Sequence, residues 1–304
     1  MRKILAALTL AFLAGYISAA CAPAPRAPTA QSRIEAVLAQ AERDPAKLRA
    51  VDSDGRALMH LAALHGLPDA IGRLARAGAD VNPRDLSGRT PLHYACENGC
   101  AECVQKLLDN HADPRAADRD LITPLQLCLA RPEAAKMLLD RGADPNAADR
   151  LGRTALHLAV RADVARLLHA KGAKVDARDR QGRTPLFLAA GRWWDREGMT
   201  ELLISAGAAV GAADEFGDTP LHQAARFNAA AQAQALVAAG AAVNSADRDG
   251  LTPLHWAAAN GAEPVARLLL ERGADRSARD HAGRTAADLA RVMGRPATAA
   301  LVAP

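Results

Sequence analysis

From residue 52 onward, apolar and polar positions recur in the same order about every 33 residues. The unit from Asp247 to Arg279 shows this order most completely. A polar stretch ends at Thr252, apolar residues follow at three-to-four spacing, and after a glycine a second apolar stripe includes Val265 and Leu268. This spacing predicts two short amphipathic helices in each unit, each with one buried face.

One four-residue phrase marks the start of the first helix in each unit. Its Thr suits a helix N-cap, its Pro suits the first helical position because no N–H bond is lost there, and its Leu faces inward. Versions of the phrase begin at Thr90, Thr123, Thr154, Thr184, Thr219 and Thr252, with degenerate copies at Ala57 and Thr285. A repeat that fills the chain favours a stacked solenoid and leaves little room for a separate catalytic domain.

The complete unit closely resembles the ankyrin repeat. Besides the phrase at Thr252, it has a turn glycine at Gly250, an alanine pair at Ala257-Ala258 and a helix-ending glycine at Gly273. The resemblance implies an all-α solenoid, in which paired antiparallel helices and hairpin-like finger loops form a curved stack. It covers nearly all of residues 32–304, with an N-terminal cap at 32–51, repeats starting near Asp52, Asp85, Asp118, Asp149, Asp179, Asp214 and Asp247, and a C-terminal cap repeat at 280–304.

The N-terminus has a different character. Arg2 and Lys3 precede a mostly apolar run, Ile4–Ile17, and then the small residues Ser18–Ala20. This order predicts a secretory signal peptide at residues 1–20, because the apolar run is too short for a comfortable membrane span.

Cys21 follows the small residues directly and is a candidate lipidation site, as in bacterial lipoproteins, although Ser18 stands where that family usually has Leu. Residues 21–31 are rich in Ala and Pro, which predicts a semi-extended tether. A lipid-anchored envelope protein and a soluble periplasmic protein therefore both remain open, and both place the folded part outside the cytoplasm.

Composition excludes nucleic-acid binding. The net charge is only +4, Arg and Asp are interleaved in almost every repeat, and aromatic residues make up 3% of the chain. A nucleic-acid surface needs a concentrated basic stripe with stacking aromatics.

Histidine and cysteine are expected to be structural. Five histidines share one slot of the repeat, where stacked helices about 8–10 Å apart would keep them from sharing one metal ion. Cys96, Cys100 and Cys103 have the spacing of an iron–sulfur motif, but they fall in or beside helices. Small buried thiols, here and at Cys128, are the expectation, with a Cys100–Cys103 disulfide left open.

No catalytic motif emerges from the sequence. It lacks a Gly-rich phosphate loop, a Gly-x-Ser-x-Gly turn and a His-Glu-x-x-His zinc motif. We therefore expect neither an enzyme nor a bound cofactor.

The candidate partner-binding residues occupy slots that the repeat leaves variable. The slot after the turn glycine is repeatedly Arg, which indicates either a solvated basic edge or a surface for an acidic partner. Exposed aromatics beside arginines are typical interface anchors, although the two Trp side chains could instead cover the lower edge of their repeat. The candidates are Arg89, Arg153, Arg183, Arg192, Trp193, Trp194, Phe216, Arg226 and Phe227.

These features together predict a monomeric, non-catalytic protein-interaction scaffold in the bacterial cell envelope, with its partner on the concave face. One alternative is an inhibitor or immunity-type protein that blocks an envelope enzyme or toxin. A second is a metal or redox protein that uses Cys96, Cys100 and Cys103. A third is a purely structural role without a partner.

Overall fold

The computed structural model describes residues 30–41, 45–191 and 198–304. The regular elements in these ranges are all helical, and an isolated β-bridge between Val51 and Ala57 is the β-type pairing in the described ranges. None of the helices in the described ranges combines the length and the apolar character that crossing a membrane requires. The expected all-α solenoid is confirmed.

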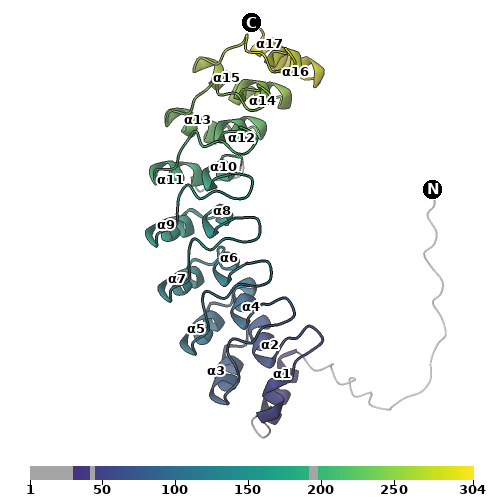
Figure 1. Ribbon diagram of the computed structural model, residues 1–304, viewed down its shortest axis with the longest axis vertical. Coiled ribbons are helices and arrows are strands. Elements are labelled where there is room, and N and C mark those ends of the chain that lie inside the picture. Colours follow the sequence, from purple (N-terminus) through teal and green to yellow (C-terminus); the bar gives the residue numbers. More distant parts are fainter. Residues whose placement is uncertain (1–29, 42–44, 192–197) are drawn as a thin grey trace, which may run out of the picture.

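The helices form two layers (Figure 1). The first helices of the repeats are α2 (Leu58–Leu64), α4 (Pro91–Asn98), α6 (Pro124–Leu127), α8 (Ala155–Leu158), α10 (Pro185–Ala190), α12 (Pro220–Arg226), α14 (Pro253–Asn260) and α16 (Ala286–Val292). The second helices are α3 (Pro68–Arg76), α5 (Ala101–Asp109), α7 (Pro132–Asp140), α9 (Ala162–Ala170), α11 (Met199–Ser205), α13 (Ala230–Ala238), α15 (Glu263–Glu271) and α17 (Pro296–Val302).

At the N-terminal end, α1 (Ala30–Ala41) and the 3₁₀ helix η1 (Pro45–Arg49) pack ahead of α2. The stack bends so that the first helices and the finger loops lie on its concave side (Figure 1).

The aspartate that begins each repeat shapes the finger. Asp85 Oδ1 accepts hydrogen bonds from the backbone N–H groups of Ser87 and Arg89, at 2.8 and 2.9 Å. The turn then needs a left-handed residue, which is usually glycine. Leu121 holds that slot in the third repeat and adopts φ +61°, so the turn survives the missing glycine at the cost of local strain.

The histidine of the repeated phrase ties each repeat to the next. His93 Nδ1 accepts from the backbone N–H of Thr90 at 3.0 Å, and His93 Nε2 donates to the Ile122 carbonyl of the following repeat at 3.0 Å. Gln126 makes the equivalent pair of bonds, to Thr123 and Arg153, both at 2.9 Å. The histidine slot is therefore structural, as expected.

Phe187 occupies the same slot in the fifth repeat and cannot make this link, because its ring has no donor. The N-cap there is provided by the Thr184 hydroxyl, which accepts from the Phe187 N–H at 3.2 Å. The fifth and sixth repeats still share a backbone bond from the Glu215 N–H to the Gln181 carbonyl, at 2.9 Å.

The interpretation of the cysteines as free buried thiols is wrong. Cys96 is joined to Cys128 and Cys100 to Cys103 by disulfides. Cys96 and Cys128 occupy the two slots of the alanine pair in adjacent repeats, where close helix packing brings their Cα atoms to 4.8 Å. Sequence spacing could not show this, because the two residues meet only when the repeats stack. Cys96, Cys100 and Cys103 therefore belong to two separate disulfides rather than to one ligand set.

Candidate partner-binding groove

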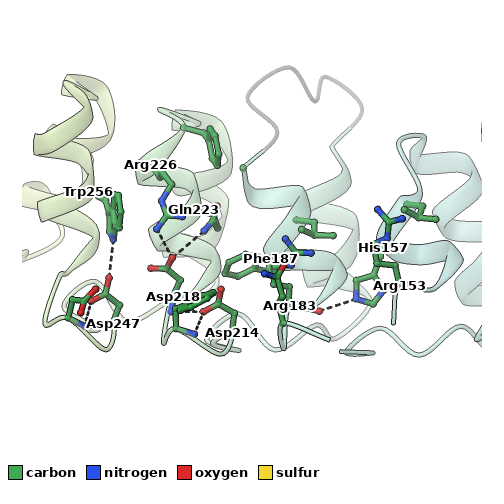
Figure 2. Close-up of a pocket in the computed structure, with 17 residues that line it drawn as sticks. Arg153, His157, Arg183, Phe187, Asp214, Asp218, Gln223, Arg226, Asp247 and Trp256 are labelled. Atoms are coloured by element: carbon green, nitrogen blue, oxygen red, sulfur yellow. Dashed lines mark hydrogen bonds and ion pairs between the residues drawn. The ribbon is translucent and has the colours of Figure 1, made fainter. Parts of the chain in front are cut away.

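A groove of about 790 Å³ lies on the concave side, along the fourth to seventh repeats. Its walls come from α8, α10, α12 and α14 and from the fingers beneath them, as Figure 2 shows. Five of the nine predicted partner-binding residues line it: Arg153, Arg183, Phe216, Arg226 and Phe227. Arg89 lies away from it, in the second repeat. Arg192, Trp193 and Trp194, like Cys21, are outside the described residues.

The arginines that follow the turn glycine are engaged by carboxylates within their own repeats. Arg153 Nε donates to Asp149 Oδ2 at 2.8 Å, and Arg183 Nε donates to Asp179 Oδ2 at 2.8 Å. Arg56 and Arg284 form the same pair with Asp52 and Asp280. Each of these arginines is thus largely neutralised where it stands.

Arg89 is the exception among them, because it reaches other partners. Its guanidinium contacts Glu97 at 2.8 Å and the buried Asp118 of the next repeat at 3.5 Å. The Tyr94 hydroxyl takes the place that Arg89 leaves open and donates to Asp85 Oδ2 at 2.6 Å.

The sixth repeat breaks this pattern, because Asp218 stands where most repeats have Arg. Asp218 is only 3% exposed, and its Oδ2 accepts from Arg226 Nη2 at 2.6 Å and from Gln223 Nε2 at 3.4 Å. Its Oδ1 has no hydrogen-bond partner among the described residues. Burial raises the pKa of Asp218 to about 6, and the charges of Asp214 and Asp247 add to this rise, against the opposing effect of Arg226.

Arg226 joins this carboxylate to an aromatic wall. Its guanidinium carbon lies 3.8 Å from the ring centroid of Trp256, in cation–π geometry. The Trp256 indole N–H donates to Asp247 Oδ2 at 3.2 Å, which fixes the ring in the next repeat (Figure 2). Asp218, Arg226, Trp256 and Asp247 therefore form one connected polar chain along the groove.

Two phenylalanines give the groove an exposed apolar rim. Phe216, at a finger tip, is 56% exposed, and Phe227, after α12, is 49% exposed. Gly191 lets the Phe227 ring approach closely, since a Cβ at that position would lie 3.0 Å from Phe227 Cδ2. Exposing two aromatic rings is costly unless something covers them.

Sequence reasoning identified Arg226 and both phenylalanines but missed Asp214, Asp218, Asp247 and Trp256. One signal was available, because Asp218 stands in a slot that holds Arg in five other repeats. The roles of Asp214 and Asp247 could not be predicted, because both resemble every other boundary aspartate in sequence.

Comparison with known proteins agrees with this architecture. The family model of ankyrin repeats (3 copies) matches residues 31–118, 59–149, 125–214 and 194–280. No curated protein matches the chain. Among solved structures, 558 chains match, so the likeness identifies an architecture rather than a partner. One is the ankyrin repeat domain of Bcl-3, described as a unique member of the IkappaB protein family. It is 30% identical with a TM-score of 0.58, over 70% of this chain and 98% of that one.

Proposed function

The chain belongs to the ankyrin-repeat family, and we propose that it binds a partner protein in the groove of the fourth to seventh repeats and catalyses no reaction. The observation that carries this proposal is the pair of exposed rings, Phe216 and Phe227, which line one groove in a chain with few aromatics. Binding energy in protein interfaces concentrates in such anchors, and a rigid stack of helices presents them with little ordering cost.

The earlier expectation of an acidic partner depended on the arginines after the turn glycine. Four of them, Arg56, Arg153, Arg183 and Arg284, are held by aspartates of their own repeats. Because paired charges attract a partner weakly, the groove and its aromatic rim support the proposal better than the arginine edge does.

Removal of both rings tests the proposed function. Full-length protein, crosslinked in intact cells, should lose its partner in the variant Phe216→Ala/Phe227→Ala, while its circular-dichroism melting curve stays nearly unchanged. The matched control is Leu86→Ala/Met293→Ala, which removes two side chains of similar exposure, 60% and 58%, outside the groove. If Phe216→Ala/Phe227→Ala captured the partner as well as the control variant does, the groove would not be the binding site.

We also propose that this binding takes place in the bacterial cell envelope, after export and lipid attachment at Cys21. The signal-like N-terminus supports this location, and so do the two disulfides, because disulfides persist in oxidising compartments and are rare in the cytosol. Mass spectrometry of the mature protein from a membrane fraction tests the lipid. An N-terminal peptide that begins elsewhere than Cys21, or an unmodified Cys21, would contradict the anchor.

A further inference from the structure

The boundary aspartates differ in one respect that sequence does not reveal. In seven repeats a side chain contacts the second carboxylate oxygen, Oδ2, by a hydrogen bond or, at Asp118, by an ion pair with Arg89 of the preceding repeat at 3.5 Å. These aspartates are Asp52, Asp85, Asp118, Asp149, Asp179, Asp247 and Asp280. Asp214 is different. Its Oδ1 accepts from the backbone N–H groups of Phe216 and Asp218, and no described side chain donates to its Oδ2.

The residue that should supply this donor is itself an acid. In the fourth and fifth repeats the slot after the turn glycine holds an arginine paired with its boundary aspartate. In the sixth repeat the slot holds Asp218, so a second carboxylate is placed beside Asp214 where a cation is usual. The Asp218 backbone N–H donates to Asp214 Oδ1 at 3.0 Å, so the two residues lie side by side, and the Asp214 charge helps to raise the pKa of Asp218.

Asp218 brings a second, independent observation. Its side chain is only 5% exposed and lines the groove, yet Oδ1 has no partner among the described residues. A buried carboxylate oxygen without a hydrogen bond is costly, and a positive charge placed nearby in the groove lowers that cost.

The cations already in the groove do not balance its carboxylates. Arg153 and Arg183 are held by Asp149 and Asp179. Arg226 Nη2 donates to Asp218 Oδ2 and its guanidinium stacks on the Trp256 ring, while its buried Nε has no hydrogen-bond partner among the described residues. Three carboxylates, those of Asp214, Asp218 and Asp247, therefore face one arginine, and this part of the groove keeps an excess of negative charge.

We propose that this groove takes a lysine or arginine side chain of the partner protein, with its charged end at Asp214, beside the buried Asp218, and its aliphatic stem against Phe216. This inference rests on the proposed function and names the partner's chemistry. A guanidinium or ammonium group supplies the cation that Asp214 lacks, and its charge offsets that of the buried Asp218 carboxylate beside it. An aromatic rim suits such a side chain, because its stem is apolar and its charge is attracted to ring faces.

Peptides selected from a random phage-displayed library on the full-length protein provide the probe. Groove-binding peptides are those that bind the parent protein but do not bind the Phe216→Ala/Phe227→Ala variant. The Kd of these peptides for the Asp214→Asn/Asp218→Asn variant is then measured by calorimetry. Asparagine keeps one acceptor oxygen for the turn, removes the charge and replaces the other oxygen with an NH2 group. The matched control is Asp85→Asn/Asp280→Asn, which makes the same change at two boundary positions outside the groove.

Groove-binding peptides should contain Lys or Arg, and their affinity should fall at least about tenfold on Asp214→Asn/Asp218→Asn but not on the control. Replacing the peptide Arg by citrulline, or Lys by norleucine, should cause a similar loss that is not additive with the protein change. If the double variant does not fold by circular dichroism, Asp214→Asn alone gives the same comparison.

Peptides that need both phenylalanines but are indifferent to the aspartates and to their own cation would overturn this inference and leave the proposed function standing. If no selected peptide depends on Phe216 and Phe227, the proposed function fails and the inference fails with it.

Discussion

At the residue scale, aspartate has oppositely shifted pKa values in the fourth and sixth repeats. Burial acts to raise the pKa of Asp149, but hydrogen bonds from the Arg153 side chain and backbone lower it overall. Burial raises the pKa of Asp218 to about 6, and here the charges of Asp214 and Asp247 add to the rise while Arg226 opposes it. The identity of a side chain therefore does not decide its charge, whereas the groups around it do.

The raised pKa of Asp218 predicts a pH-dependent effect on stability. The folded protein holds this proton more tightly than the unfolded chain, whose aspartate has its ordinary pKa near 3.9. The destabilisation by Asp218 is therefore absent in acid and grows as pH rises from about 4 through about 6.

We expect the free energy of unfolding of Asp218→Asn, relative to the parent protein, to increase by about 2 kcal/mol between about pH 4.5 and pH 7. Urea denaturation followed by circular dichroism at each pH measures it. Asp280→Asn is the control, because the pKa of Asp280 is lowered in the folded protein and its pH dependence has the opposite sign. Parallel stability curves for Asp218→Asn and the parent would contradict the assignment.

At the scale of the element, the repeated phrase starts a helix and also joins it to the next repeat. Its histidine accepts a bond from the N-cap residue and donates one across the repeat boundary, as at His93. Gln126 shows that these two bonds, and not the imidazole itself, are what the slot requires. Phe187 shows that a repeat can lose the bond across the boundary when the backbone contact remains.

Replacement of His93 tests this account with a control that the chain itself suggests. His93→Gln should leave stability nearly unchanged, whereas His93→Ala leaves the Thr90 N–H and the Ile122 carbonyl without this partner and opens a cavity. The expected loss for His93→Ala is about 2–3 kcal/mol. Chemical denaturation of both variants measures it, and equal losses would show that imidazole packing matters more than the hydrogen bonds.

At the scale of the whole molecule, each repeat contacts mainly its neighbours, so stability varies along the stack. The Cys96–Cys128 disulfide joins the second and third repeats covalently. The junction of the fifth and sixth repeats, which lies within the groove, lacks both a disulfide and the histidine link among the described residues, and backbone and side-chain hydrogen bonds join the fingers of the two repeats there.

Removal of the inter-repeat disulfide should therefore have a local effect. Cys96→Ala/Cys128→Ala frees a loop that spans 32 residues, and loop entropy of that size predicts a loss of about 3–4 kcal/mol. Hydrogen exchange by mass spectrometry should show faster exchange in α4–α7 and little change in α14–α17. Cys100→Ala/Cys103→Ala, which opens a bridge between residues only three positions apart, should have a smaller effect. Uniform loss of protection along the chain would contradict nearest-neighbour behaviour.

The sequence by itself determined the architecture, because the signals for it are local and repeated. Thr and Pro at helix starts, glycine in the turns and apolar residues at helical spacing act within a few residues of one another. Because the unit recurs in eight near-copies, the repeats bury their apolar faces by stacking on one another. The exposed Phe216 and Phe227 were also predictable, because they interrupt this repeat.

Only the tertiary structure decided which of these local features interact. Cys96 meets Cys128, Arg226 stacks on Trp256, and Asp214 is left without a side-chain donor because Asp218 replaces an arginine. Each of these outcomes depends on distances between residues in different turns or repeats, which one linear pattern does not encode. The physical reason is that burial and charge pairing are properties of neighbourhoods, and stacking the repeats creates those neighbourhoods.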